Sequence, residues 1–140
     1  MRAAEVLVVD DDAGVAETIA FILSDQGYSV RTASDGIDGL RCIAELRPDV
    51  IVLDVEMPRL SGPGMAAAMF VENAGIERIP IVLVSGTAAL TEVAAQVGTP
   101  YALAKPYSLD DLVDLVARAL RELIAPIPKI RKGSCTPEGR

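Results

Sequence analysis

The sequence predicts a three-layer, doubly wound α/β fold, in which five parallel strands in the order 2-1-3-4-5 are covered by helices on both faces. Strand-like and helix-like patterns alternate five times along the 140 residues, a length that suits one domain with one core. Several of the strand-like runs are almost continuously β-branched, which is typical of parallel strands buried on both faces. Right-handed crossovers between such strands favour the doubly wound arrangement, for which this strand order is one of the two common ones.

The first two units differ in polarity. Glu5–Asp10 contains the apolar run Val6–Val9 and predicts a buried strand. The pattern after it predicts a helix over Ala13–Gln26, followed by a glycine suited to a left-handed helix end. The second strand, Tyr28–Ala33, is more polar, as expected at the edge of a sheet. Its helix, Asp35–Leu46, is closed by Arg47-Pro48.

The third and fourth units contain the most apolar strands, Val50–Asp54 and Ile79–Val84. Between them, a loop with proline and glycine at Met57–Pro63 leads into an alanine-rich helix expected over Gly64–Asn73. A further helix is expected to follow the fourth strand and to run through Val97. Gly75 and Gly98 stand where these two helices would end.

The last unit combines a short strand, Tyr101–Ala104, with an amphipathic helix over Leu109–Leu123 that Ser108 could cap. Residues 1–124 would form the single domain. Residues 125–140 contain prolines and glycines without periodicity, and they predict a flexible basic tail.

Charge and composition exclude several classes of protein. The net charge is −7, and the tail carries four basic residues and one acidic residue, +3, so residues 1–124 have a charge of −10. An acidic body argues against nucleic-acid binding, and no apolar stretch is long enough to cross a membrane. The two cysteines, Cys42 and Cys135, are too few for a disulfide framework, so a reducing cytoplasm is expected. With no histidine, the chain lacks the usual general base and cannot itself carry a phosphohistidine.

Acidic residues follow two strands that would be neighbours at the centre of the sheet. Asp10, Asp11 and Asp12 end the first strand, and Asp54 ends the third. Asp12 is suited to capping the next helix, which needs no further role. Closely packed carboxylates either raise one another's pKa or hold a cation, and Mg²⁺ prefers such oxygen ligands, so a magnesium site is expected at this edge.

Phosphoryl transfer is the chemistry that these residue types would serve together. Asp54 is the candidate nucleophile, because a carboxylate can form an aspartyl phosphate. Lys105, at the end of the fifth strand, would offset the charge of the phosphoryl oxygens. The hydroxyl of Ser85, after the fourth strand, would donate a hydrogen bond to one of those oxygens, although Ser85 or Thr87 could equally cap a helix.

Four short motifs in order resemble the receiver domain of two-component response regulators, the CheY-like family. They are Val-Val-Asp-Asp, Leu-Asp-Val-Glu-Met-Pro with Gly62 following, Val-Ser-Gly, and Ala-Lys-Pro-Tyr, and the resemblance covers about residues 4–124. It implies that Asp54 accepts the phosphoryl group, that Ser85 is the switch hydroxyl and that Lys105 binds the phosphate. It also implies the Mg²⁺ site, in which Asp11 would be a direct ligand and Asp10 would act through a water molecule, together with Asp54 and the backbone carbonyl of Glu56. The Lys105–Pro106 peptide bond is cis in that family.

One position departs from the family pattern. The family has Tyr or Phe three residues before the lysine, where an aromatic side chain swings inward on activation, and here that residue is Ala102. Tyr101 is one residue too early, and the alternation of side chains along a strand sends it to the opposite face.

The resemblance implies a signalling module that is not an enzyme acting on a separate substrate. A histidine kinase or histidine phosphotransfer protein would supply the phosphoryl group, and a downstream target protein would bind the phosphorylated form. A phosphate-independent adaptor is one alternative. A phosphatase of the haloacid dehalogenase type, using Asp10 and Asp12, is another, but its last metal motif is absent because Asp110-Asp111 falls in a helical pattern.

Overall fold

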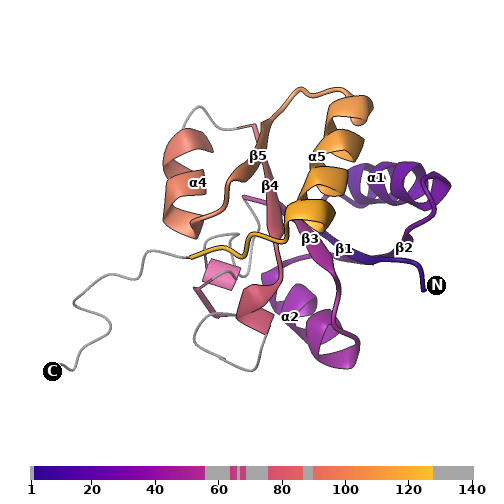
Figure 1. The fold of residues 1–140 in the computed structure, drawn as a ribbon, viewed down its shortest axis with the longest axis horizontal. Helices are drawn as coiled ribbons and strands as arrows, with labels where there is room; N and C mark the ends of the chain where they lie inside the picture. The colour runs from indigo at the N-terminus through magenta and orange to yellow at the C-terminus, as the bar shows by residue number, and fades with distance from the viewer. Residues whose placement is uncertain (1, 56–63, 66, 69–75, 87–89, 128–140) are drawn as a thin grey trace, which may run out of the picture.

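The sheet has the predicted strand order. The computed structural model describes residues 2–55, 64–65, 67–68, 76–86 and 90–127. Five parallel strands form one sheet in the order β2-β1-β3-β4-β5 (Figure 1). Their bounds are β1 Glu5–Val9, β2 Ser29–Ala33, β3 Val50–Asp54, β4 Ile81–Ser85 and β5 Tyr101–Ala104. The flavodoxin-like α/β fold expected from the alternating pattern is therefore confirmed.

The helices follow their strands as predicted, with small differences at their ends. Their bounds are α1 Ala13–Asp25, α2 Gly36–Glu45, α4 Leu90–Val97 and α5 Leu109–Glu122, with a short 3-10 helix η1 at Ile76–Arg78. Residues 64, 65, 67 and 68 are helical, but the rest of the helix expected over Gly64–Asn73 lies outside the described residues. Among the described residues, no helix is long and apolar enough to span a membrane.

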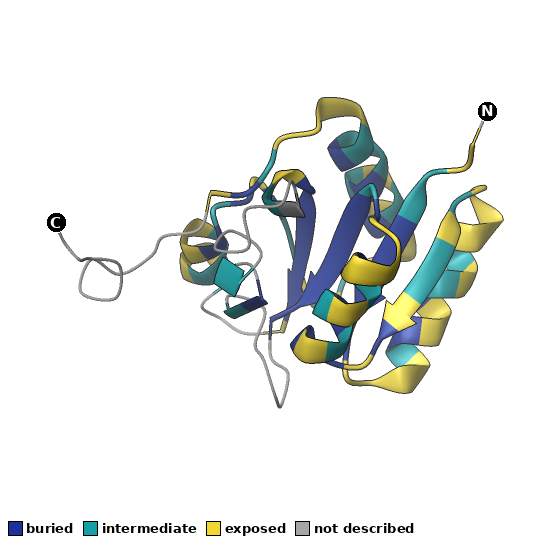
Figure 2. Ribbon diagram, turned by 90° about the horizontal axis from the view of Figure 1, so that it is seen from below, coloured by how far each residue is buried: buried dark blue, intermediate teal, exposed yellow. Residues whose placement is uncertain are grey.

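Side chains alternate along the strands into two cores, one on each face of the sheet. Leu7, Ile51 and Leu83 belong to the core under α2 and α4, which includes Ile43 and Val97. The residues next to them in sequence, such as Val8 and Val52, belong to the core under α1 and α5. Figure 2 shows the central strands as a buried layer between helices whose outer sides are exposed. This arrangement explains the near-continuous apolar runs of the sequence.

Side-chain caps define the starts of three helices. The side chains of Asp12, Asp35 and Ser108 accept hydrogen bonds from backbone N–H groups in the first turns of α1, α2 and α5. Gly27 and Gly98 have positive φ angles of 97° and 79° after α1 and α4, as predicted for left-handed helix ends.

A short segment after α5, residues 124–127, is named here the C-terminal strap. Its Ile127 N–H donates to the carbonyl of Gly98 at 3.0 Å, and Pro126 is buried. A Cβ atom on Gly98 would lie 1.9 Å from the Ile127 carbonyl oxygen, so only glycine allows this approach. Residues 125–127, assigned to the flexible tail by the sequence analysis, therefore pack against the domain at the start of β5.

Candidate functional site

Three carboxylates meet at the carboxyl ends of β1 and β3. Asp10 and Asp11 follow β1, Asp54 ends β3, and these two strands are direct neighbours in the sheet. One carboxylate oxygen from each of the three residues lies within 4.8 Å of the others. Asp10 and Asp54 are buried, with 6% and 8% of their surface exposed, whereas Asp11 is open to solvent. The structure thus brings together the acidic residues that the sequence analysis singled out.

Burial makes this cluster costly to ionise. Loss of solvent raises the pKa of Asp10, although the Asp12 backbone N–H, which donates to its Oδ1 at 2.9 Å, and Lys105 both act in the opposite direction. Burial also raises the pKa of Asp54, and the charge of Asp10 adds to that effect, against the opposing influence of Lys105. A bound cation would relieve the repulsion between these carboxylates.

Lys105 brings a positive charge to the same edge. Its Nζ lies 3.4 Å from Asp54 Oδ1, and its backbone N–H donates to the Ser85 carbonyl at 2.8 Å, which ties the loop after β5 to the end of β4. Burial tends to lower the pKa of the lysine, but Asp54 and Asp10 outweigh it and hold the pKa above its ordinary value. The ammonium is therefore held in its charged form. The Lys105–Pro106 peptide bond is cis, as the resemblance implied.

Ser85 ends β4 beside the lysine and is almost fully buried, with 1% of its surface exposed. A Cβ on the next residue, Gly86, would come within 3.8 Å of the Lys105 side chain, so the chain passes close to the lysine stem. Two other residues of the expected site, the metal ligand Glu56 and the alternative cap Thr87, lie outside the described residues.

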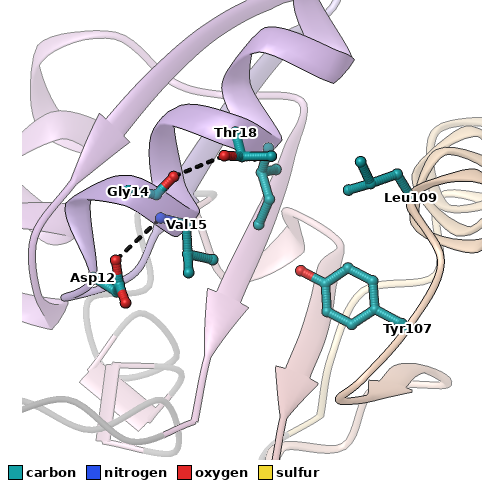
Figure 3. Close-up of a pocket in the computed structure, with 7 residues that line it drawn as sticks. Asp12, Gly14, Val15, Thr18, Tyr107 and Leu109 are labelled. Atoms are coloured by element: carbon teal, nitrogen blue, oxygen red, sulfur yellow. Dashed lines mark hydrogen bonds between the residues drawn. The ribbon is translucent and has the colours of Figure 1, made fainter.

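Asp12 takes the structural role assigned to it. Its Oδ1 accepts a hydrogen bond from the Val15 N–H at 3.1 Å at the start of α1 (Figure 3). This cap satisfies one of the free N–H groups of the first helical turn.

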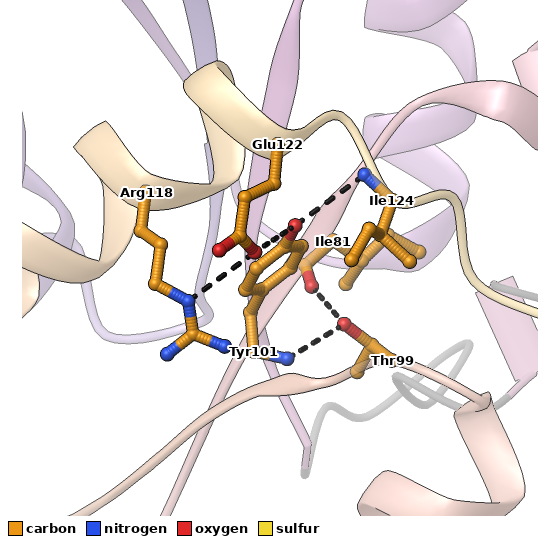
Figure 4. A network of polar contacts seen from close by, with 6 residues as sticks. All are labelled: Ile81, Thr99, Tyr101, Arg118, Glu122 and Ile124. Carbon is orange, nitrogen blue, oxygen red and sulfur yellow. Dashed lines mark hydrogen bonds and ion pairs between the residues drawn. The ribbon is translucent and has the colours of Figure 1, made fainter.

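Tyr101 and Ala102 lie on opposite faces of β5, as predicted. Ala102 packs against the core under α2 and α4, whereas Tyr101 is fully buried in the core under α1 and α5. The Tyr101 hydroxyl donates to Glu122 Oε1 at 3.0 Å and accepts from the Ile124 N–H at 3.3 Å (Figure 4). These contacts anchor the aromatic ring to the end of α5, away from the acidic cluster.

A groove that the sequence analysis did not identify runs between α1 and the loop before α5. It encloses about 320 Å³, and Figure 3 shows Tyr107 and Leu109 facing α1 across it. Burial raises the pKa of Tyr107, which also senses the charges of Lys105, Asp10 and Asp54, so the groove borders the acidic site. The sequence signal was present in the Lys-Pro-Tyr motif, but only the fold brings Tyr107 opposite Val15 and Thr18.

The donor set suits a hard divalent cation. Asp10, Asp11 and Asp54 offer only carboxylate oxygens, which are ligands that Mg²⁺ accepts. Burial and mutual repulsion destabilise these charges when no cation neutralises them, which fits a cation site better than a purely structural cluster.

Fold and site together define a doubly wound α/β domain with a partly buried acidic cluster and a lysine at the switch point of its sheet. The sequence model of the response regulator receiver domain matches residues 6–117, and the chain belongs to this family.

Similar proteins agree with this assignment. The chain is 38% identical over 118 residues to the response regulator MprA of Mycobacterium sp. strain KMS, an alignment that covers 83% of this chain and 50% of MprA. The chain therefore spans about half the length of the curated relatives that it matches. The chemotaxis protein CheY4 of Vibrio cholerae superposes with a TM-score of 0.76 at 29% identity, covering 84% of this chain and 98% of CheY4. NtrX from Brucella abortus superposes with a TM-score of 0.77 at 29% identity, covering 87% of this chain and 28% of NtrX.

Proposed function

We propose that this receiver domain accepts a phosphoryl group on Asp54 in a Mg²⁺-dependent reaction and signals through the phosphorylated form. The observation that supports the proposal most directly is the convergence of Asp10, Asp11 and Asp54 within 4.8 Å, with the Lys105 ammonium 3.4 Å from Asp54. A structural cluster would not need a lysine and a buried serine at the ends of two further strands.

The chemistry requires a donor in trans, because the chain contains no histidine. An oxygen of the Asp54 carboxylate attacks the phosphorus of a phosphohistidine on a kinase or phosphotransfer protein, and an O–P bond forms as the P–N bond breaks. The electron pair of the broken bond stays on the imidazole nitrogen, which can then take a proton from water. Lys105 and the Ser85 hydroxyl bind the oxygens of the transferred group. Attack of water on the aspartyl phosphate returns the carboxylate and releases inorganic phosphate.

Magnesium would be held by Asp10, Asp11 and Asp54, with the carbonyl of Glu56 as a further ligand implied by the family. When bound, it neutralises part of the negative charge that builds up on the phosphoryl oxygens. Burial raises the pKa of Asp10 and Asp54 in spite of the opposing charge of Lys105, so a further cation would favour the ionised carboxylates.

The partners in this proposal are a histidine kinase or phosphotransfer protein and a downstream target. The groove between α1 and the loop before α5 offers the donor an apolar surface beside the site, lined by Val15, Ile19 and Leu109. A cytoplasmic location and the absence of a nucleic-acid partner remain predictions from the sequence. The chain spans only about half the length of the curated relatives that it matches.

The test is the intact mass of the protein after incubation with acetyl phosphate, with and without Mg²⁺, for wild type and Asp54→Asn. A single phosphoryl adduct that requires Mg²⁺ and is lost in Asp54→Asn is expected. The absence of an adduct in wild type would contradict the proposal and favour the phosphate-independent adaptor. An adduct that survives in Asp54→Asn but is lost in Asp10→Asn would instead favour the phosphatase chemistry.

A further inference from the structure

A hollow of about 220 Å³ lies between the edge strand β5 and helix α5. Ala102, Leu103 and Leu115 provide an aliphatic lining, and Asp111, Asp114 and Arg118 add polar groups. The hollow is separate from the acidic cluster, and it also lies apart from the groove beside α1. Figure 1 shows β5 and α5 next to each other on this side of the domain.

The charge around the hollow is negative. The Arg118 guanidinium is already engaged, because its Nε lies 3.3 Å from Glu122 Oε1 and its Cζ lies 5.2 Å from the centre of the Tyr101 ring (Figure 4). Asp111 and Asp114 are exposed, and neither carboxylate forms an ion pair with another residue in the described ranges. The hollow therefore suits an aliphatic side chain flanked by basic groups.

The C-terminal strap ends close to the start of β5, on the domain that carries the hollow. Its last residue, Ile127, is hydrogen-bonded to Gly98, just before the start of β5, and Ile124 is held by the Tyr101 hydroxyl. Ala102 lies four positions after Gly98, a span of at most about 14 Å for an extended chain. An extended chain of three to four residues beyond Ile127 spans about 10–14 Å, so Ile130 and the basic residues around it are within reach of the hollow.

The residues beyond the strap have the matching chemistry. Residues 128–140, named here the basic tail, include Ile130 with Lys129 before it and Arg131 and Lys132 after it. The tail has a net charge of +3, whereas residues 1–124 have a net charge of −10. Tethering at Ile127 keeps the tail at a high effective concentration, so even weak contacts would suffice for docking.

We propose that the basic tail docks on its own domain at this hollow, with Ile130 over the aliphatic lining and the basic side chains facing Asp111 and Asp114. This contact does not depend on phosphoryl transfer. A partner that binds the surface of β5 and α5 would have to displace the tail, so the tail would partly determine the affinity of that partner.

The test compares backbone amide NMR spectra of the full chain and the full-length variant Lys129→Gln/Arg131→Gln/Lys132→Gln. Chemical-shift differences are expected at Ala102, Leu103 and the first half of α5, and they should shrink severalfold when salt rises from about 0.05 to 0.5 M. When both chains also carry Asp114→Asn, the chemical-shift differences between the basic and the neutralised tail should be smaller by about half or more. A matched control is Glu45→Gln, an exposed carboxylate on α2 in the other helix layer, in which the differences should persist unchanged.

Three results would overturn the proposal. Differences confined to Gly98 and the strap would mean that the tail does not reach the hollow. Differences unaffected by Asp114→Asn would exclude the acidic rim as the docking site. Differences that grow with protein concentration would show that the tail binds a second copy of the chain.

Discussion

Replacing Gly98 with alanine tests the packing of the C-terminal strap. The substitution has two separable costs, namely the positive φ of 79° and the contact of a Cβ with Ile127. Gly27 provides a matched control, because its φ is 97° and a Cβ there would meet nothing within 4 Å. Gly27→Ala therefore measures the backbone cost alone, which is about 1–2 kcal/mol.

The additional cost at Gly98 follows from the strap. A Cβ 1.9 Å from the Ile127 oxygen and 2.7 Å from its nitrogen cannot be accommodated unless the strap moves. Moving it breaks the Ile127–Gly98 hydrogen bond, worth about 1 kcal/mol, and exposes part of the buried Pro126. We expect Gly98→Ala to lower the free energy of unfolding by about 2–4 kcal/mol in total, or about 1–2 kcal/mol more than Gly27→Ala.

Urea denaturation of both variants, in the full chain and in a chain that ends at Ala125, measures this difference. In the shortened chain the excess cost of Gly98→Ala over Gly27→Ala should vanish, because residues 126 and 127 are absent. An excess that persists in the shortened chain, or equal costs of the two substitutions in the full chain, would refute the assignment of the clash to the strap.

The remaining predictions concern the acidic cluster and Tyr101. Asp10→Asn should stabilise the metal-free protein by about 1–3 kcal/mol at neutral pH, because it removes repulsion between carboxylates within 4.8 Å of one another. It should also abolish most of the stabilisation that added Mg²⁺ gives to wild type. Thermal unfolding with and without Mg²⁺ measures both effects. The pKa values of Asp10 and Asp54 are raised in the folded state, so metal-free wild type should gain stability as the pH falls from neutral toward the ordinary pKa of a carboxyl group. Asp10→Asn should gain less. If urea denaturation at several pH values gave the same dependence of unfolding free energy on pH for both proteins, this reasoning would be contradicted. Tyr101→Phe should cost about 1–2 kcal/mol, because Glu122 and the Ile124 N–H lose their shared partner, and a cost near zero in urea denaturation would mean that water replaces the hydroxyl.

Local patterns were sufficient to predict the fold and most of the acidic site. Runs such as Val50–Asp54 are typical of parallel strands covered on both faces. A parallel sheet aligns the carboxyl ends of its strands, so Asp10 and Asp54 were expected to lie close together. Asp12 was predictable as a cap for a different, local reason, because capping involves a backbone N–H only three residues away in the sequence.

Contacts between distant residues could not be predicted in this way. The strap has no periodic pattern, and its docking depends on the missing side chain of Gly98, 29 positions before Ile127. The partners of the Tyr101 hydroxyl, Glu122 and Ile124, are more than 20 residues away along the chain. The hollow beside α5 depends on how closely the helix packs on β5, which no sequence pattern specifies.

The central claim is that Asp54 itself receives the phosphoryl group. The most direct measurement is to treat the phosphorylated protein with borohydride, which reduces an aspartyl phosphate to homoserine, and to locate the modified residue by peptide mass spectrometry. The account predicts homoserine at position 54 in wild type and none in Asp54→Asn. Homoserine at position 10 or 11, or phosphate retained on Ser85 instead, would contradict it.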